Sequence, residues 1–211
     1  MMTANKESFY PKIKSNLKTL LDIPIDVNRI SILNDLVDYL RSSDNQGIQL
    51  IFICTHNSRR SQFAQVWAKI ASIYFNAPIR SFSGGVEITA CNERTIASLK
   101  RSGFTIVKNN EENENPVYIV SYLDENESIQ LFSKMYDDVV NPSKNFAAVM
   151  TCSDADTNCP FIPGAEVRIP LNYEDPKEFD NTVEESAKYD ERSKQIASEM
   201  FYVFSRLNIN Q

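Results

Sequence analysis

Cys54 and Arg60 stand six positions apart in the stretch LIFICTHNSRRSQ, residues 50–62, directly after an apolar run. A cysteine at the end of a buried strand is often only a small core residue, since free cysteine is among the most buried residue types. The small polar residues between Cys54 and Arg60 suggest a second role. Their main-chain N–H groups can converge on one point, and a following helix adds the positive end of its dipole. The stretch therefore predicts an anion-binding loop with a thiol at its base.

The same surroundings favour a nucleophilic sulfur at Cys54. N–H donors, a helix N-terminus and a guanidinium each stabilise a thiolate relative to a thiol. Arg60 can hold two oxygens of a tetrahedral anion in bidentate fashion, which lysine cannot do. Ser61 can donate its hydroxyl to the sulfur and ease its departure as a leaving group. A cysteine and an arginine at this spacing also occur by chance, so the pair is a weak signal by itself.

Two further cysteines, Cys152 and Cys159, lie in VMTCSDADTNCPFIPG at the end of another apolar run. They are either incidental thiols or reactive ones. A zinc site would need more ligands, and only His56, Cys54 and Cys91 remain to supply sulfur or imidazole, so no metal site is expected. Cys91 precedes a predicted helix and is expected to be structural.

A carboxylic acid that can serve as a proton donor lies in LNYEDPKEF, where Asp175 precedes Pro176. An Asp before a Pro is commonly only a turn initiator. The position of Asp175 after a predicted strand favours a general acid, and Glu174 is the alternative. Both interpretations stay open on the residues alone.

Short apolar runs and amphipathic stretches alternate from Ile48 onward and must position these residues. Predicted strands cover 48–53, 79–85, 104–107, 145–151 and 167–171, and predicted helices cover 61–75, 92–103 and 183–207. This alternation predicts an α/β fold with a parallel sheet covered on both faces. In such a sheet, ligands bind beyond the carboxyl ends of the strands, where Cys54 lies.

Two segments depart from this alternation. Residues 1–46 predict a helical extension, with apolar residues at helical spacing in 9–21 and 30–40 before the break RSSDNQG. The extension packs on the domain, mediates dimerisation or covers the site. Residues 116–136 carry two β-rich runs separated by DENE and predict an inserted hairpin. The expected division is therefore an extension, 1–46, and a catalytic domain, 47–211.

Composition narrows the class of protein. Hydrophobic content of 42% and charged content of 24% are typical of a folded globular chain. A formal net charge of −6 argues against nucleic acid and membrane surfaces as partners. No apolar run approaches the length of a spanning helix, and the first residues do not resemble a signal peptide, so a cytoplasmic location is expected. Four cysteines in 211 residues are too few for a disulfide scaffold.

The motif CTHNSRRS resembles the C-x5-R-S loop of the low-molecular-weight protein tyrosine phosphatase superfamily, which includes the thioredoxin-coupled arsenate reductases. The resemblance covers roughly residues 48–207. It implies a flavodoxin-like three-layer fold with a four-stranded parallel sheet. It also implies that Cys54 is the nucleophile and Arg60 the oxyanion clamp, while Asn57 and Ser61 shape the loop. The implied substrate-binding residues are Thr55, His56, Asn57, Ser58, Arg59 and Ser61.

Two residues depart from that family pattern. His56 stands where the family usually has glycine, at a position that tolerates positive φ, and it is expected to be a solvent-facing rim residue. Arg59 stands where the family often has cysteine or an apolar residue, and it is expected to be a second charge at the mouth. Asp175-Pro176 matches the Asp-Pro loop from which the family takes its proton donor.

The segment around Cys152 and Cys159 resembles the C-S-D-A-D-x-N-C-P segment of thioredoxin-coupled arsenate reductases, which simple phosphatases of the superfamily lack. The resemblance implies a relay for arsenic detoxification. Cys54 attacks arsenate, Cys152 attacks the Cys54 sulfur and releases arsenite, and Cys159 moves the disulfide to where thioredoxin can reduce it. The segment is expected to be a mobile loop.

Two other functions remain open. A phosphatase would use Cys54, Arg60 and Asp175 on phosphotyrosine or a small phosphomonoester, with the other cysteines idle, because the same loop accepts both anions. A sensor would bind an anion without turnover. No bound cofactor is expected apart from a monovalent cation, which the sequence neither requires nor excludes.

Overall fold

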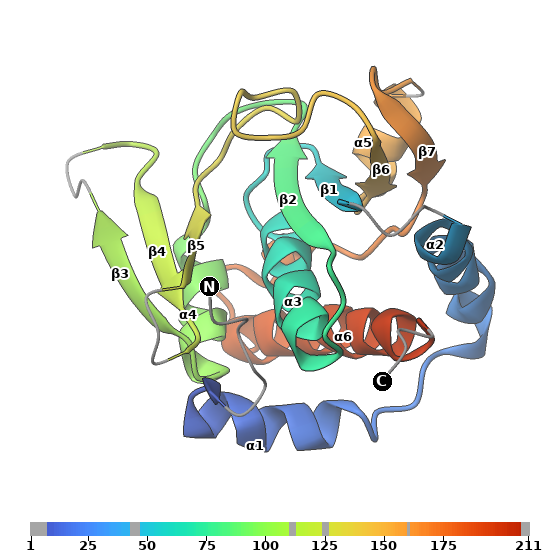
Figure 1. Cartoon of the computed structure of the whole chain (residues 1–211). Coiled ribbons are helices and arrows are strands. Elements are labelled where there is room, and N and C mark those ends of the chain that lie inside the picture. Colours follow the sequence, from blue (N-terminus) through green and yellow to red (C-terminus); the bar gives the residue numbers. More distant parts are fainter. Residues whose placement is uncertain (1–7, 43–46, 110–112, 124–126, 160, 208–211) are drawn as a thin grey trace.

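The computed structural model describes residues 8–42, 47–109, 113–123, 127–159 and 161–207. Most of the two expected breaks, RSSDNQG and DENE, lies outside the described residues. Four parallel strands form the central sheet in the order β2-β1-β6-β7 (Figure 1). They are β1 (Gln49–Cys54), β2 (Arg80–Gly85), β6 (Phe146–Met150) and β7 (Ala165–Ile169). The expected four-stranded parallel sheet is confirmed, and β1 and β6 are buried because both of their faces are covered.

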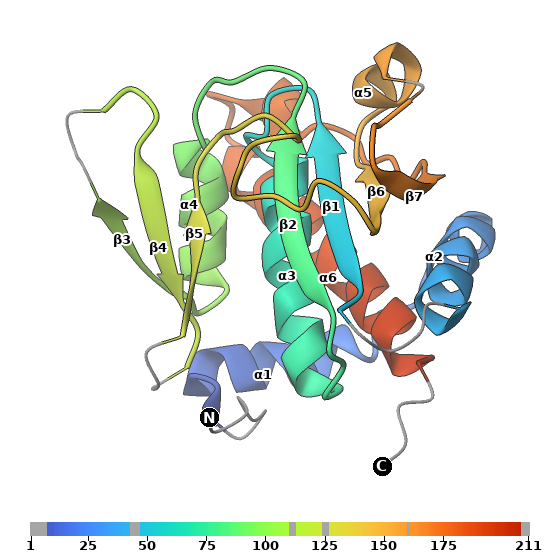
Figure 2. The same ribbon diagram turned by 45° about the horizontal axis from the view of Figure 1, so that its top comes forward.

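Helices α3 (Arg60–Tyr74) and α6 (Glu185–Ser205) lie on one face of this sheet, and α4 (Glu93–Arg101) packs beside them against α6 and β3 (Thr105–Asn109) (Figure 2). Helix α3 packs on β1 and β2 and is covered in turn by α6, so it is buried on almost every side. Trp67 is 2% exposed and donates its indole N–H to Ser193 Oγ at 2.9 Å. Trp67 is therefore a core residue.

The opposite face of the sheet carries a thinner layer. Helix α5 (Ser153–Asn158) covers it together with irregular chain from the segments 132–145 and 161–164. The apolar side chains below this layer include Ile51, Ile53 and Met150, all fully buried. Cys54 and Cys152 belong to the same cluster, so this thin layer lies next to the predicted chemistry.

A second sheet is antiparallel and stands apart from the first (Figure 1). It contains β3 (Thr105–Asn109), β4 (Val117–Ser121) and β5 (Ser128–Leu131) in that order. The predicted hairpin is confirmed for β4 and β5, but its second strand ends at Leu131 rather than 136. The predicted strand 104–107 is the third strand of this sheet and pairs with β4. Ile106 is buried and Val107 is exposed, as expected for a sheet with one face toward solvent.

The N-terminal segment forms α1 (Pro11–Leu20), a 3₁₀ turn (Val27–Arg29) and α2 (Ile30–Ser42). Pro11 occupies the first helical position, where its missing N–H costs nothing. The apolar faces of both helices pack into the cluster that contains α3 and α6. Arg29 pairs with Glu199 on α6 and donates to the carbonyl oxygen of Asn172 at 2.9 Å. The extension therefore packs on the domain. No helix in the described ranges is both long and apolar enough to cross a membrane.

Two glycines allow a matched test of local packing. Gly164 and Gly47 both have positive φ, +82° and +84°, but a Cβ at Gly164 would lie 2.0 Å from Ser143 O, whereas one at Gly47 would have no neighbour within 4 Å. We expect Gly164→Ala to lower the free energy of unfolding by about 2–4 kcal/mol and Gly47→Ala by about 1 kcal/mol. Urea unfolding of both variants measures this, and equal losses would contradict the clash.

Candidate active site

Residues 54–60 form a loop between the end of β1 and the start of α3, here called the anion loop. The carbonyl oxygens of residues 55–58 each accept a hydrogen bond of 2.7–3.0 Å from a residue outside the loop. The donors are Val86 N, Ser133 Oγ, Gln62 Nε2 and Asn92 N. The N–H groups of residues 56–59 donate to no acceptor within the described part of the chain. Because carbonyl and N–H point in opposite directions across a peptide, these N–H groups are left to line the inside of the loop, as an anion cradle requires.

Cys54 is 3% exposed at the base of this loop, and its Sγ lies 3.0 Å from Ser61 Oγ. Asn57 Nδ2 donates to the same Ser61 Oγ at 2.8 Å. Since that oxygen already accepts a hydrogen bond from Asn57, the Ser61 hydroxyl is free to donate a hydrogen bond to the Cys54 sulfur. Asn57 is thus the residue that orients Ser61.

Asn57 also carries the positive φ of the loop, at +46°, so the position expected to be strained is not His56. Asparagine visits this region more readily than most residues because its short side chain bonds locally. Its Oδ1 accepts from Lys134 N at 3.1 Å, which fixes the loop against the segment that follows β5. His56 lies at the rim, 42% exposed, with Nε2 3.2 Å from Glu87 Oε2. The predicted rim position of His56 is confirmed.

Arg60 begins α3 and is held on two sides. Its Nη1 donates to Tyr173 O at 2.9 Å, and its Nη2 donates to Asp175 Oδ2 at 2.6 Å. Its Nε is buried and has no hydrogen-bond partner among the described residues. A buried guanidinium nitrogen without an acceptor is costly, so this N–H fits an oxyanion bound in the loop.

Asp175 follows β7 and caps the 3₁₀ turn η3 (Pro176–Phe179). Its Oδ1 accepts from Lys177 N at 3.1 Å while its Oδ2 accepts from Arg60. The structure therefore brings Asp175 to the anion loop, as predicted, but as an ion-paired acceptor. A proton-donor role requires the pair with Arg60 to open. Glu174 is 91% exposed and contacts Arg192, so the alternative acid points away.

Arg59 is not a free charge at the mouth, which corrects the sequence-based expectation. Its side chain is 11% exposed, and Nε donates to Tyr189 OH at 2.7 Å. Tyr189 donates in turn to Asp180 Oδ1 at 2.8 Å. Burial and the Asp180 carboxylate raise the pKa of Tyr189 above its ordinary range, so it stays a neutral donor. Sequence reasoning missed Tyr189 and Asp180, because nothing in their spacing links them to a loop over a hundred residues away.

The remaining predicted thiols lie at the same edge of the sheet as Cys54. The register pairs Ile53 with Met150 in parallel, so β1 and β6 end side by side. Cys152 is fully buried, and its Sγ lies 3.4 Å from Thr55 Oγ1, next to Cys54 in the anion loop. Cys159 packs against the same apolar cluster and is partly exposed. The structure thus brings Cys152 next to the anion loop, while Cys159 lies against the same cluster at the other end of the segment 153–158.

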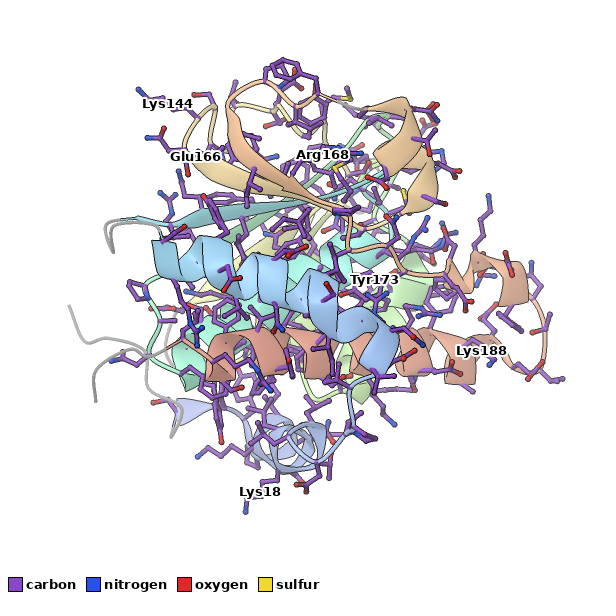
Figure 3. All side chains as sticks on the ribbon, turned by 90° about the vertical axis from the view of Figure 1, so that its right-hand side faces the viewer. Lys18, Lys144, Glu166, Arg168, Tyr173 and Lys188 are labelled. Atoms are coloured by element: carbon purple, nitrogen blue, oxygen red, sulfur yellow. The ribbon has the colours of Figure 1, made fainter. Side chains whose placement is uncertain are left out.

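The segment between Cys152 and Cys159 is helix α5, where a mobile loop was expected. Cys152 Sγ caps it by accepting from Ala155 N, and Asp154 and Asp156 lie in its first turn, where acidic side chains suit the helix dipole. Arg168 on β7, labelled in Figure 3, pairs with Asp156 and donates to Cys159 O. These contacts stabilise a helix that its six residues alone would not form.

Cys91 belongs to the main core cluster rather than to the cluster of Cys54 and Cys152, although it also lines a hollow beside His56, Ser58 and Arg59 of the anion loop. Burial raises the pKa of its thiol to about 12, so at pH 8 only about one molecule in ten thousand carries the thiolate. We expect iodoacetamide at pH 8 to label Cys159 in the native protein and to leave Cys91 unmodified, as read by peptide mass spectrometry. Labelling of Cys91 at a rate comparable with Cys159 would contradict its structural role.

A hollow of about 390 Å³ adjoins the anion loop and forms its mouth. It is lined in part by His56, Arg59, Thr89, Asn92, Glu93 and Lys177. Within the described ranges, no group of three or more His, Cys, Asp or Glu side chains could hold a metal ion.

No protein-family model matches the chain. Arsenate reductase 2 of Staphylococcus haemolyticus is 31% identical to it over 127 residues, which are 60% of this chain and 77% of that relative. Among solved structures, a low-molecular-weight phosphotyrosine phosphatase of Vibrio cholerae is 13% identical with a TM-score of 0.48, covering 74% of this chain and 94% of that one. A thioredoxin-dependent arsenate reductase of Corynebacterium glutamicum is 19% identical with a TM-score of 0.41, covering 91% and 84%. On the sequence match and its coverage, the chain belongs to the arsenate reductase family.

Proposed function

We propose that this chain reduces arsenate to arsenite through Cys54, Cys152 and Cys159, with thioredoxin as the electron donor. The observation that carries the proposal is the 3.4 Å contact between Cys152 Sγ and Thr55 Oγ1, because it brings a second buried thiol to the anion loop. A phosphatase has no use for such a thiol. A curated relative that is 31% identical is named an arsenate reductase. A relay of free thiols also suits a reducing compartment, so we place the protein in the cytoplasm.

The first step is attack on the bound anion. Arsenate sits among the N–H groups of residues 56–59 and the free Nε of Arg60, which neutralise its oxygens. The Cys54 thiolate bonds to arsenic, and one arsenate oxygen leaves as water after protonation. The Ser61 hydroxyl, 3.0 Å from Cys54 Sγ, donates to the sulfur and stabilises the thiolate before attack.

The second step forms a disulfide and reduces arsenic. The Cys152 thiolate attacks Cys54 Sγ, the sulfur–arsenic bond breaks, and its electron pair leaves with arsenic as arsenite. Arsenic gains two electrons and the two thiols lose them. Ser61, which stays beside Cys54, stabilises this sulfur when it becomes a leaving group in the next exchange.

The third step needs α5 to unwind. Cys159 attacks Cys152 Sγ, and Cys54 leaves as a thiolate. The six-residue helix separates its two flanking cysteines by about 10 Å along its axis, whereas a disulfide needs Cα atoms about 4.4–6.8 Å apart. A Cys152–Cys159 disulfide therefore cannot form across an intact α5. Unwinding would also carry the disulfide outward from the buried cluster, where thioredoxin can reduce it.

This unwinding gives a structural prediction. In the oxidised Cys152–Cys159 form, we expect amide hydrogen exchange in residues 153–158 to become at least tenfold faster than in the reduced form. Exchange in α3 serves as the internal control and should stay unchanged. Equal protection of α5 in both forms would contradict the relay.

Purified protein tests the activity directly. With thioredoxin, thioredoxin reductase and NADPH, we expect NADPH oxidation only when arsenate is added, with one arsenite released per NADPH consumed. Cys159→Ser should stop this cycle while leaving the anion loop intact. No arsenate-dependent oxidation would refute the proposal.

Hydrolysis of phosphate esters is the second candidate, and the 2.6 Å contact of Asp175 with Arg60 favours it by placing a carboxyl group at the loop. If this activity dominates, aryl phosphate hydrolysis will be fast and unaffected by loss of both Cys152 and Cys159. Asp175→Asn should then lower it by about 10²–10⁴-fold, the usual contribution of a general acid.

A further inference from the structure

A second cavity lies behind the anion loop, between the edge strands of the two sheets. Strand β5 is the strand of the antiparallel sheet nearest to β2 in both ribbon views (Figures 1 and 2). The cavity between them has a volume of about 310 Å³ and is lined by residues of β2, β5, α3 and the segment 132–141. Its lining mixes apolar side chains, such as Phe82, Ile129 and Phe132, with basic ones. None of these side chains takes part in the proposed relay.

Lys134 is the unusual member of this lining. It is only 3% exposed, and its Nζ lies 4.6 Å from the centroid of the Phe132 ring. No ion pair or side-chain hydrogen bond of its ammonium group is found within the described residues. Asp138 and Cys91 are the other charged or ionisable groups that act on it, and burial lowers its pKa to about 8. Because burial disfavours the charged ammonium and no carboxylate of the described residues is ion-paired with it, an anion beside it would be favoured.

The other basic residues of the cavity lie around its edge. Arg80 stacks over the Phe82 ring, with Cζ 5.0 Å from the centroid, and Lys69 pairs with Glu127 at 3.5 Å. The lining therefore carries three basic side chains, of which only Lys69 has a carboxylate partner among the described residues, in a chain whose formal net charge is −6. An inorganic ion would satisfy the cations but leave the aromatic walls empty. A molecule with an apolar body and one anionic group matches both features.

We propose that this cavity binds a small organic anion, a carboxylate or a phosphate ester on an aromatic or aliphatic body, with its anionic group against Lys134. The apolar body lies along Phe82, Ile129 and Phe132. This inference is independent of arsenate reduction, because it concerns binding at a site on the far side of the anion loop.

Three consecutive residues of the segment that lines the cavity form hydrogen bonds with the anion loop or with the start of α3. Phe132 O accepts from Gln62 Nε2 at 2.9 Å, Ser133 Oγ donates to His56 O at 2.8 Å, and Lys134 N donates to Asn57 Oδ1 at 3.1 Å. A ligand that moves residues 132–134 therefore moves the groups that orient the loop. Occupancy of the cavity should change the affinity of the loop for its oxyanion, and the reverse effect must be equal.

Fluorine NMR with 4-fluorobenzoate as the probe tests the site. Saturating inorganic phosphate fills the anion loop, so that the probe reports on the cavity. We expect saturable binding to the parent protein and at least tenfold weaker binding to Lys134→Met, which keeps length and apolar volume but removes the charge. Lys144→Met, at an exposed lysine on the outer surface (Figure 3), is the matched control and should bind as the parent does. Val140→Trp, which fills the cavity mouth, should also abolish binding.

Each outcome decides the proposal. Absence of saturable binding, or equal affinity in Lys134→Met, overturns the site. If added inorganic phosphate competes with the probe without reaching a plateau, the cavity is a site for inorganic ions, and the proposal of an organic anion site is also overturned. Phenyl phosphate, tested on Cys54→Ser so that it is not turned over, separates the two ligand chemistries by its affinity relative to the benzoate. A phosphate affinity of the anion loop that does not change when the probe binds refutes the coupling.

Discussion

Cys152→Ser is expected to abolish multiple-turnover arsenate reduction, with kcat at least 10³-fold below that of the parent. Serine cannot form the disulfide that releases arsenite, so the reaction should stop at the arsenylated Cys54. The fold should survive, because serine is a good helix cap and can replace the sulfur that accepts from Ala155 N at 3.4 Å. Arsenite release and arsenate-dependent NADPH oxidation measure the loss, and circular dichroism checks the fold.

Cys91→Ser is the control for that experiment. Cys91 is 2% exposed, as buried as Cys54 and Cys152, and it lines the hollow at the mouth of the anion loop, but it belongs to the main core cluster rather than to theirs. We expect this variant to lose stability and to keep the turnover of the folded protein. If Cys152→Ser turned over at the parental rate, or Cys91→Ser lost turnover while folded, the assignment of Cys152 as the attacking thiol would be wrong.

Arg60→Lys is expected to lower kcat/KM by about 10²–10⁴-fold for arsenate, and for any aryl phosphate that is hydrolysed. Lysine keeps the positive charge but has one nitrogen, whereas Arg60 uses Nη1 for Tyr173 O, Nη2 for Asp175 and leaves Nε for the anion. One nitrogen cannot occupy the three separate positions from which Arg60 makes these contacts, so the substitution cannot keep all of them. Steady-state kinetics that separate kcat from KM show whether the loss falls on anion binding or on the chemical steps.

Arg59→Lys is the adjacent control. Arg59 contacts Tyr189 and Asp180, and its Nε lies 3.9 Å from Asp175 Oδ1, so its loss should act on the position of the loop and of Asp175. We expect a decrease below tenfold. A larger effect for Arg59→Lys than for Arg60→Lys would show that the clamp has been assigned to the wrong arginine.

The sequence was most informative where local rules decide the structure. Continuous apolar runs identified β1 and β6, and the rule that ligands bind beyond strand ends placed Cys54 and Asp175 at one edge of the sheet. Cys152 reaches the same edge because β6 pairs directly with β1. Each of these inferences depends on neighbours in the sequence or on one strand pairing.

Long-range contacts were not predictable in this way. The carbonyl oxygen of Tyr173 holds Arg60, and main-chain groups carry no signal of residue type. Tyr189 reaches Arg59 only because α6 crosses behind α3, and Lys134 is buried only because the segment after β5 turns back under the loop. Helix α5 was missed because Arg168, on another element, stabilises it through Asp156.

The amino-terminal segment lies away from Cys54 but supports the active site through main-chain contacts. Arg29 holds the main chain at Asn172, and the next residue, Tyr173, offers the carbonyl that anchors Arg60. A truncation that removes Arg29 therefore also removes a contact next to the carbonyl that holds the Arg60 guanidinium. We expect a truncated protein that lacks this Arg29 contact to lose turnover before it loses expression.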